Sequence, residues 1–463
     1  MKVPHIVKMA CLLFGIGFAN PVAAPAAIMV TNIAQGCTAN HSLFVESDSS
    51  LWEMVTTDGV YYTDTVPQIH ELVAGGVMAM AVNHFDSLFV KSDGSLWGMG
   101  GNVYGDLGIP TWTDSFADQP EEIVTNGVTA VAMGYGHSLF LKSDGSLWAM
   151  GRNDAGQLGD GTFSTYTSPS PYGVNPPEEI VTNGVIAIAA GAGQSLFLKS
   201  DGSLWGMGWN LYGQLGDGTG NQATNQPERI VANGVTAIAG GGSHSLFLKS
   251  DGSLWGMGWN VYGQLGCGTF GSSNLPAEIL ASNVTAIAAG DYHSLFIKSD
   301  GSLWAMGDNS YGQLGDGTYN QAAYQPEEIV ASNVLAIAAG ENHSLFVKSD
   351  GSLWGMGDNT EGQLGDGFWE DSDNESIVPE QILPKPSPVL VQTVSNSDLQ
   401  FTAVCGFGGN FYLLTATNLT QPLSQWTPIW TNNISYRYLN IFSATLTNAV
   451  NSGGQQFYIL QSR

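Results

Sequence analysis

The fold is decided by residues 235–280, VTAIAGGGSHSLFLKSDGSLWGMGWNVYGQLGCGTFGSSNLPAEIL, one copy of a unit that recurs along the chain. VTAIA, SLFLK and SLWGMG are short apolar runs rich in β-formers, and the Ser-Asp-Gly between the last two is typical of a hairpin turn. PAEIL predicts a fourth short strand, because proline is tolerated at the start of a strand. No stretch of the unit has helical periodicity. The unit therefore predicts a sheet of four short strands.

The unit occurs seven times. Its Ser-Leu-Trp triplet recurs at intervals of 45 to 57 residues, with the tryptophans at Trp52, Trp97, Trp148, Trp205, Trp255, Trp304 and Trp354. A period of about fifty residues with four strands in each copy is typical of a radial array of sheets. The sequence therefore predicts an all-β fold, a seven-bladed β-propeller over residues 30–383.

Link lengths predict how the strands are ordered. The segment from SLWGMG to the next PxEI holds roughly twenty residues, whereas the other links are only a few residues long. Passing from the outer edge of one blade to the inner edge of the next crosses three strand spacings, about 14 Å. We therefore expect the long segment to join the blades, with the sheet order PxEI, VTAIA, SLFLK, SLWGMG and residues 379–383 closing the ring beside residues 30–33. Alternating strand directions place the long loops and the Gly-x-x-His turns on one face, and the hairpins on the other.

The chain is acidic and has few charges. Only 11% of its 463 residues are charged, and 40 acids against 13 bases give a net charge of −27. Binding to phosphates requires clustered Lys and Arg, so we expect no nucleic acid partner and no adhesion to anionic lipid. A hydrophobic content of 43% is enough to bury a large core, which argues against a disordered chain.

The N-terminus has the layout of a secretory signal. Lys2 and Lys8 precede the apolar run MACLLFGIGFA (residues 9–19), and the small residues NPVAAPAA follow. The run is too short to span a bilayer, and a buried first strand is the alternative interpretation. We expect residues 1–26 to be a signal peptide and the mature chain to lack a transmembrane segment. The expected location is secreted or in the cell envelope, periplasmic or extracellular.

The run Asn-x-x-Gly-Gln-Leu-Gly-x-Gly is the most specific part of the repeat. It occurs at residues 153–161, 210–218, 260–268, 309–317 and 359–367. Through this run and the HSLFLKSDGSLWGMG pattern before it, residues 30–383 resemble the regulator of chromosome condensation repeat family, whose members are seven-bladed propellers. The chain departs from the family regularly, because methionine stands where the family usually has tryptophan, at Met99, Met150, Met207, Met257, Met306 and Met356.

The resemblance implies protein binding rather than one defined activity. The best-known family member is a nuclear exchange factor for a small GTPase, and secreted bacterial proteins of similar repeat type include inhibitors that bind β-lactamases through one propeller face. Fold alone does not transfer function. The sequence has no nucleophile elbow, phosphate-binding loop, metalloprotease motif or paired-acid signature, so we expect no enzyme and no cofactor.

Beyond the repeats the sequence changes character. Residues 384–388 (PKPSP) predict a stiff linker, and the short apolar runs of residues 389–463 predict a small all-β domain similar to a β-sandwich. NFYLLTATNLTQPLSQWTPIWTN (residues 410–432) resembles C-terminal modules of secreted proteins from Verrucomicrobia-type bacteria. This resemblance implies sorting, attachment to the cell surface or contact with carbohydrate.

Three cysteines lie outside the signal, at Cys37, Cys267 and Cys405. An odd number without close spacing is neither a disulfide framework nor a zinc site. Whether Cys37 and Cys405 pair is left open by the sequence.

Histidines recur just before Ser-Leu-Phe. Five blades have His41, His137, His244, His293 and His343, and the other two have Asp86 and Gln194. Equivalent positions on separate blades lie too far apart for one metal ion, whose ligand bonds are about 2 Å. We therefore expect hydrogen bonds to the turn backbone and no metal.

Recurring acids also have a structural interpretation. The aspartates of Leu-Gly-Asp-Gly predict Asx-type turns, at Asp160, Asp217, Asp316 and Asp366. The acidic loop near Asp371, residues 370–375, only weakly resembles a calcium loop, because Ser376 stands where a glycine is required.

Aromatic residues on the long loops are the candidate binding residues. Aromatics among Gly, Ser and Asn on loops of varied sequence suit a recognition surface, although the same side chains could instead cover the propeller rim. The candidates are Tyr166, Tyr172, Trp209, Trp259, Tyr319 and Trp369. We expect an exported, non-catalytic propeller that binds a protein or glycan partner through this face. The alternatives are a guanine-nucleotide exchange factor-like regulator of a small GTPase and a carbohydrate-binding envelope protein.

Overall fold

The chain divides into two compact units. The computed structural model describes residues 29–383, apart from 35, 56–67, 85, 110–115, 165–174, 221–222, 320–321 and 366–374, and six strands between residues 390 and 462. One unit comprises residues 30–349 and 353–381, and the other includes residues 382–463. Every regular element in these stretches is a β-strand. A helix long and apolar enough to cross a membrane is not found in the described part of the chain.

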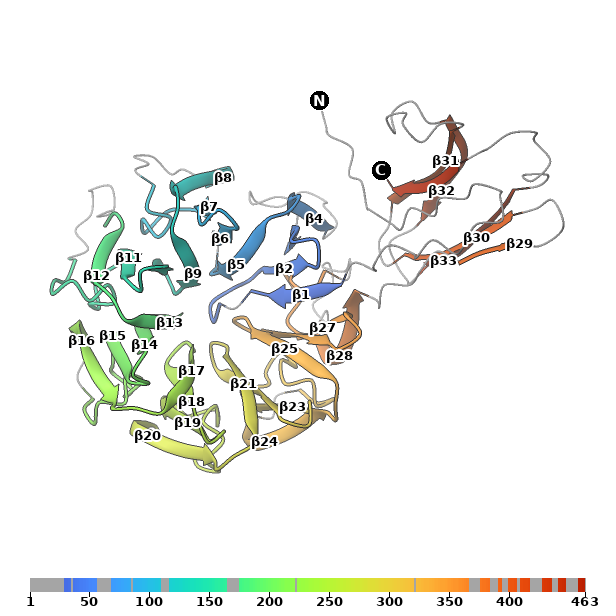
Figure 1. Cartoon of the computed structure of the whole chain (residues 1–463). Helices are drawn as coiled ribbons and strands as arrows, with labels where there is room; N and C mark the ends of the chain where they lie inside the picture. The colour runs from blue at the N-terminus through green and yellow to red at the C-terminus, as the bar shows by residue number, and fades with distance from the viewer. Residues whose placement is uncertain are drawn as a thin grey trace. The chain divides into compact units, whose positions relative to one another are not determined.

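Seven four-stranded sheets follow one another around a ring in Figure 1. Each sheet is a blade made from one continuous segment, and blades 1 to 7 follow the chain order. The innermost strands are β1 (Val30–Ile33), β5 (Val77–Val82), β9 (Val128–Met133), β13 (Val185–Ala190), β17 (Val235–Gly240), β21 (Val284–Ala289) and β25 (Val334–Ala339). The second strands are β2 (Ser42–Glu46), β6 (Asp86–Lys91), β10 (His137–Lys142), β14 (Gln194–Lys199), β18 (His244–Lys249), β22 (His293–Lys298) and β26 (His343–Lys348).

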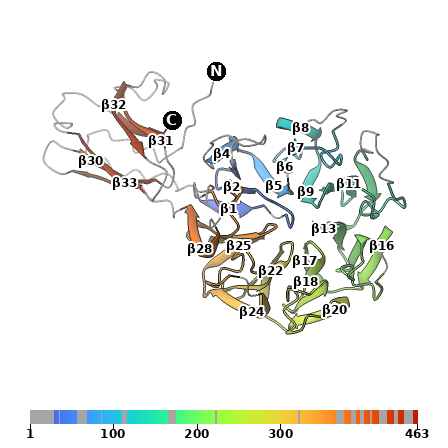
Figure 2. The ribbon, with the colours of Figure 1, turned by 180° about the vertical axis from the view of Figure 1, so that it is seen from behind.

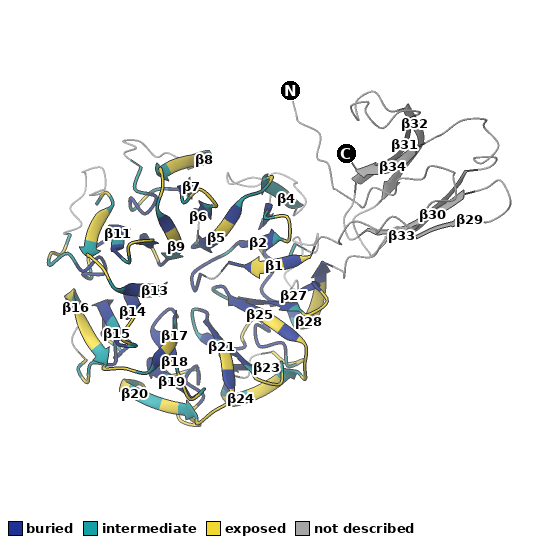
Figure 3. Ribbon diagram, viewed as in Figure 1, coloured by how far each residue is buried: buried dark blue, intermediate teal, exposed yellow. Residues whose placement is uncertain are grey.

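The third and fourth strands complete each blade, and exposed residues concentrate on fourth strands such as β16, β20 and β24 (Figure 3). The third strands are β3 (Leu51–Val55), β7 (Leu96–Gly101), β11 (Leu147–Gly151), β15 (Leu204–Trp209), β19 (Leu254–Gly258), β23 (Leu303–Gly307) and β27 (Leu353–Gly357). The fourth strands are β4 (Gln68–Val73), β8 (Phe116–Val124), β12 (Glu178–Val181), β16 (Ala223–Val231), β20 (Ser273–Leu280), β24 (Ala323–Val330) and β28 (Ser376–Leu383). The predicted seven-bladed, all-β propeller is confirmed.

The predicted strand order is wrong. PxEI forms the outermost strand of its own blade and not the innermost strand of the next, so the order is VTAIA, SLFLK, SLWGMG, PxEI. The short turn between blades suffices because each inner strand begins beside the hairpin of the preceding blade. The amide of Val128, where β9 begins, donates to the carbonyl of Gly94 in the hairpin of blade 2 (2.9 Å).

The predicted closure of the ring is also wrong. Residues 379–383 belong to β28, which pairs with β27 of its own blade and not with β1. Instead β1 packs against β25 and β26 of blade 7, so no strand is shared where the chain closes on itself. Figure 2 shows the same ring from behind, with the first and last blades side by side. Closure therefore depends on contacts between side chains and turns.

The two ends of the blades differ as predicted. The amide of Trp209, where a long loop begins, donates to Gly193 in the turn between β13 and β14 (2.8 Å). At the other end, the hairpin amide of Ser200 donates to Gly184 in the turn between blades (2.9 Å). We call these the long-loop face (the long loops and the turns between first and second strands) and the hairpin face.

Each lysine of the hairpin face lies over a tryptophan ring. In blade 5, Lys249 Nζ is 3.7 Å from the ring centroid of Trp255, and Trp255 Nε1 donates to Ser253 Oγ (2.8 Å). Ser253 in turn donates through its hydroxyl and its amide to Asp251 (2.6 and 2.9 Å), and these bonds lower the pKa of Asp251. The same lysine–tryptophan pairing occurs at Lys91, Lys142, Lys199, Lys298 and Lys348. These cation–π contacts were not predicted, and they occupy most of the basic residues of the propeller.

The recurring histidines join neighbouring blades. His244 Nε2 of blade 5 lies 2.9 Å from Ser294 Oγ of blade 6, and Ser294 Oγ donates back to the carbonyl of Gln264 in blade 5 (2.8 Å). Equivalent relays are His137–Ser195–Gln157, His293–Ser344–Gln313 and His343–Ser42–Gln363. The last relay closes the ring between blades 7 and 1. The histidines thus bond a serine of the next blade, where we expected their own turn backbone.

These imidazoles are neutral. Because Ser294 uses its hydrogen on the Gln264 carbonyl, its oxygen accepts from His244, which places the imidazole proton on Nε2. The other nitrogen, Nδ1, is buried without a hydrogen-bond partner in the described structure. Burial lowers the pKa of His137, His244, His293 and His343 to about 3. A positive charge would have neither solvent nor acceptor there.

The relay leaves no room beside the imidazole. A Cβ on Gly290 would lie 2.2 Å from Cε1 of His293 and 2.6 Å from the carbonyl oxygen of Gly340 in the next blade. Both distances are far below van der Waals contact, so the turn requires glycine at this close approach.

Six further strands form two three-stranded sheets in the second unit. Their orders are β29-β30-β33 and β32-β31-β34. The strands are β29 (Leu390–Thr393), β30 (Leu399–Cys405), β31 (Gly409–Ala416), β32 (Thr427–Ile434), β33 (Asn440–Leu446) and β34 (Phe457–Ser462). The β-sandwich stays a prediction for this unit.

We predict that His244→Ala destabilises the propeller more than His244→Gln. Alanine removes a buried hydrogen bond and leaves a cavity, which together cost about 2–4 kcal/mol. Glutamine retains a donor, as Gln194 does in blade 4, where its Nε2 donates to the carbonyl of Gly241 (2.9 Å). Thermal unfolding followed by circular dichroism should rank wild type, His244→Gln and His244→Ala in falling Tm. An unchanged Tm in His244→Ala would contradict the relay.

Candidate functional site

Aromatic rings from blades 4, 5 and 6 form a belt on the long-loop face. Tyr212 lies 6.1 Å from Trp209 between ring centroids and stacks on Trp259 at 4.8 Å. Trp259 meets Tyr292 edge-on at 5.4 Å. Tyr262 lies against both Trp259 (6.0 Å) and Tyr292 (5.3 Å). These five residues are called the aromatic belt.

The tight loop after each third strand holds the belt in place. In blade 4, Asn210 Oδ1 accepts from the amide of Leu215 (2.9 Å), and Gln214 Oε1 accepts from the amide of Tyr212 (3.0 Å). Asn210 and Gln214 are buried, so the polar side chains turn inward while Tyr212 is left at the surface. The recurring run therefore fixes the backbone that presents each ring.

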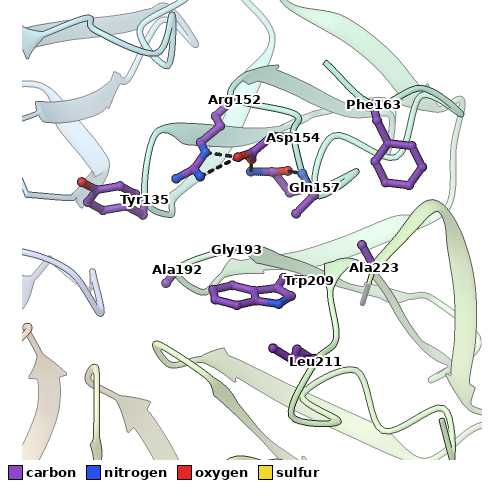
Figure 4. A pocket seen from close by; sticks show the side chains of 11 residues that line it. Tyr135, Arg152, Asp154, Gln157, Phe163, Ala192, Gly193, Trp209, Leu211 and Ala223 are labelled. Atoms are coloured by element: carbon purple, nitrogen blue, oxygen red, sulfur yellow. Dashed lines mark hydrogen bonds and ion pairs between the residues drawn. The ribbon is translucent and has the colours of Figure 1, made fainter. Parts of the chain in front are cut away.

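A cavity of about 640 Å³ lies at the edge of the belt, between blades 3 and 4. Figure 4 shows Trp209 facing Arg152 and Asp154 across it, with Tyr135 and Phe163 toward its two ends. Leu211, Gln157, Gly193 and three alanines complete the lining. Phe163 is 49% exposed and Leu211 44%, which leaves apolar surface open to solvent beside a tryptophan.

Arg152 supplies a charge to this cavity that is already paired. Its guanidinium donates twice to Asp154, from Nε to Oδ1 (2.8 Å) and from Nη2 to Oδ2 (2.6 Å). It also lies over the rings of Tyr104 (5.5 Å) and Tyr135 (5.7 Å). Burial opposes both charges, but the mutual pair outweighs it, so the pKa of Arg152 is raised and that of Asp154 is lowered. The cavity wall is polar but nearly neutral.

Acidic residues lie at the other end of the belt. Asp291 precedes the belt residue Tyr292, and its neighbours include Glu341 and Asp308. Burial and the charges of Glu341 and Asp308 raise the pKa of Asp291 to about 7, although the hydroxyl of Tyr292 donates to it. Glu341 Oε2 lies 3.6 Å from Nδ1 of His84 in blade 2. The long-loop face therefore changes from aromatic on blades 4 and 5 to acidic on blades 6 and 7.

Blade 2 replaces the relay with a buried carboxyl pair. Asp86 stands at the histidine position, Asp106 at the glutamine position, and Asn83 where blades 3 to 7 have glycine. Asn83 Nδ2 donates to Asp106 Oδ2 (2.9 Å), and Asn83 Oδ1 accepts from the amide of Asp86 (2.8 Å). Burial and the adjacent Asp106 raise the pKa of Asp86, which bonds to Asp106 as the protonated partner. The shorter Asp86 side chain leaves room for Asn83 beside it.

The candidates predicted from sequence divide into three groups. Trp209 lines the cavity and, with Trp259, belongs to the belt. Tyr319 is 40% exposed on the blade 6 loop, and its hydroxyl donates to the carbonyl of Glu375 (3.4 Å) rather than joining the belt. The remaining candidates, which lie outside the described residues together with the acidic loop 370–375, are Tyr166, Tyr172 and Trp369.

Several belt and cavity residues were not predicted. Tyr212 and Tyr262 stand inside the recurring run, and Tyr135 and Tyr292 stand in the Gly-x-x-His turns. Repetition of these motifs favoured a structural interpretation. The usable signal was that the turn residue varies among blades while the histidine after it recurs.

The recurring aspartates Asp160, Asp217 and Asp316 cap loops, as predicted, whereas Asp366 lies outside the described residues. Asp217 Oδ1 accepts from the amide of Thr219 (2.8 Å) and from Asn210 Nδ2 (3.0 Å). Cys267 takes the same position in blade 5, where Asn260 Nδ2 lies 3.2 Å from its Sγ. Groups of three or more His, Cys, Asp or Glu that could hold a metal are not found within the described ranges. Cys37 is a free, buried thiol, and burial and the charge of Asp291 raise its pKa.

Together the fold and its repeats define a seven-bladed β-propeller whose ring is closed by turns and side chains. Residues 128–363, about half of the chain, match the regulator of chromosome condensation (RCC1) repeat without a gap. The chain therefore belongs to the RCC1-repeat family, and the resemblance seen in the sequence is confirmed for the propeller.

Similar proteins match only part of their own length. Ultraviolet-B receptor UVR8 of Arabidopsis thaliana is 34% identical over 26% of this chain and 27% of its own length. Protein RCC2 homolog of Xenopus laevis is 31% identical over 41% of this chain and 42% of its own. The chain thus spans less than half of these relatives.

Solved structures show the same fold. Human WBSCR16 has a TM-score of 0.62 at 23% identity, covering 73% of this chain and 91% of its own. Yeast RCC1 (Prp20), solved bound to Kap60, has a TM-score of 0.58 at 22% identity, covering 70% and 80%.

We predict that Asp86→Asn stabilises the protein at neutral pH. A carboxyl with a raised pKa in the folded state must keep its proton where the unfolded chain has lost it, so it costs stability above pH 4. Asparagine keeps a donor toward Asp106 without this cost, and we expect a gain of roughly 1–2 kcal/mol at pH 7.5. The Tm difference from wild type should vanish near pH 3.5. Asp86→Ala is the control and should lower Tm at both pH values.

Proposed function

We propose that this chain is a non-catalytic propeller that binds a protein partner through the aromatic belt and the adjoining cavity. The observation that carries the proposal is exposed apolar surface gathered at one place on the long-loop face. The exposed fraction of the side chain is 37% for Tyr135, 44% for Leu211, 46% for Val261 and 49% for Phe163. Interface centres are enriched in Trp, Tyr and Arg, the residue types that surround this cavity.

The belt supports a macromolecular partner over a small ligand. Its five rings extend over three blades, whereas the cavity itself takes up only the junction of blades 3 and 4. Two solved structures of similar fold are of proteins that bind other proteins: yeast RCC1 (Prp20) binds Kap60, and Prp20p of Saccharomyces cerevisiae binds Gsp1p and histones. Those partners belong to those proteins, and they support here only the use of this fold for binding proteins.

A photo-crosslinker distinguishes the two faces. We expect Val261→p-benzoylphenylalanine, on the long-loop face, to give covalent adducts with another protein in extracts of the source cells. The matched control is Asp251→p-benzoylphenylalanine on the hairpin face, which should give none. An excess of unmodified chain should compete the adducts away. Equal labelling from both positions, or none from Val261, would sink the proposal.

Export is the second part of the proposal. Lys2, Lys8 and the apolar run of residues 9–19 support a cleaved signal, and residues 389–463 are the segment we assign to sorting or surface attachment. Cell fractionation with intact mass measurement should find a chain that begins at Ala27 outside the cytoplasm. Leu13→Arg, which interrupts the apolar run, should retain the uncleaved chain inside. A full-length cytoplasmic wild-type chain would refute export.

A further inference from the structure

Among the described residues of the propeller, the long-loop face has no lysine or arginine that is free of a carboxylate partner. Outside residues 1–8 and 384–463, the chain has eight bases, six of which are the hairpin lysines. Arg229 lies on the outer strand β16, and only Arg152 is on the long-loop face, where it is held by Asp154. A partner that docks there meets aromatic rings and carboxylates.

The carboxylates gather where the belt ends. Asp308 and Glu341 lie close enough to Asp291 for their charges to raise its pKa, and Asp358 occupies in blade 7 the position of Asp308. Asp308 is buried and accepts from Ser310 Oγ (2.7 Å) and Gln313 Nε2 (3.1 Å), both neutral donors, so it adds negative charge without being open to a partner. None of these acids has a lysine or arginine beside it. Their mutual repulsion is a cost that an incoming cation would remove.

The belt connects the cavity to these acids. Trp209 is shared by cavity and belt, and three ring contacts lead from it through Tyr212 and Trp259 to Tyr292, which adjoins Asp291. Each contact is between 4.8 and 6.1 Å long. An extended peptide of about five residues covers a path of this order. Cations that cross it would lie over ring faces.

We propose that the long-loop face takes an extended basic segment of a protein partner. A large apolar or aromatic side chain of that segment fills the cavity between Trp209 and Arg152. Lys or Arg side chains about five residues away reach Asp291 and Glu341 across the belt. This inference rests on the proposed function and adds the chemical class of the partner.

The cavity suits an anchor of this kind. Its lining is aromatic and aliphatic except for Gln157 and the Arg152–Asp154 pair, whose charges offset each other, so an apolar side chain can enter without stranding a buried charge. An acidic segment would instead meet the repulsion of blades 6 and 7. The charge of the face therefore selects the sign of the partner.

The test is selection from a displayed library of random peptides of about twelve residues, long enough to cover cavity, belt and acids. The full chain is the target, and the enriched peptides are then synthesised. We expect them to share an aromatic or large apolar residue with Lys or Arg about five positions away. Trp209→Ala, and separately Asp291→Asn with Glu341→Gln, should each raise Kd about tenfold or more. Asp201→Asn on the hairpin face is the control and should leave Kd unchanged.

Two further measurements separate binding from folding. Leu211→Asn changes an exposed lining residue and should weaken the peptides while Tm stays at the wild-type value. Binding should also weaken below pH 7, because Asp291, which faces Glu341, Asp308, Tyr292 and the thiol of Cys37, then takes up a proton. Asp291→Asn should abolish that pH dependence.

The outcomes are distinct. Enriched peptides that are acidic or lack an aromatic residue, no enrichment at all, or unchanged Kd in the variants would overturn the basic segment. If Val261→p-benzoylphenylalanine still yields adducts, protein binding by this face stands and only the partner class is wrong. If the crosslinks fail as well, both proposals fall.

Discussion

The hydrogen-bond relay from histidine to serine to glutamine carbonyl is the interaction on which this propeller depends. Among the described strands, none is shared between the first and last blades, so strand pairing does not hold the ring closed. The contact of His343 with Ser42 and of Ser42 with Gln363 crosses that junction with the geometry found between blades 3 and 4, blades 5 and 6, and blades 6 and 7. Since every atom of the relay is buried, water cannot replace a lost partner, and each junction is costly to open.

The relay also constrains which residues can change together. In blades 3, 5, 6 and 7 a glycine stands three residues before the relay histidine, because the imidazole fills the space that a Cβ would take, as at Gly290. Blade 2 has no imidazole, and there the glycine position holds Asn83, which bonds to Asp86 and Asp106. Blade 4 uses Gln194 and keeps its glycine, since the amide group occupies the same place. Histidine, the Asn83–Asp86–Asp106 group and Gln194 thus provide buried hydrogen bonds in different ways at equivalent positions.

Sequence periodicity was sufficient for the strands, their number and the two faces, because the side-chain pattern and the turn residues recur in every copy. It was not sufficient for the strand order. We assumed that a link between blades must cross the full width of a sheet, which would require a long segment. In the structure, the turn before Val128 lies against the hairpin of the preceding blade at Gly94, so a link of three residues is enough. The site was predicted at Trp209 and Trp259, which differ from their counterparts in other blades. Tyr212 and Tyr262 were missed because they recur.

One repeat position explains how the chemical character of the long-loop face changes around an otherwise uniform ring. The residue before the recurring asparagine is Arg152 in blade 3, Trp209 and Trp259 in blades 4 and 5, and Asp308 and Asp358 in blades 6 and 7. The asparagine itself is buried and bonded to the loop in each case, so the neighbouring position can change without disturbing the relay. The recurring residues therefore stabilise the fold, and the variable position beside them determines the charge and the apolar surface of the face. A face that runs from paired cation through aromatic rings to acids follows from five substitutions at that position, and its direction around the ring is the property a partner would read.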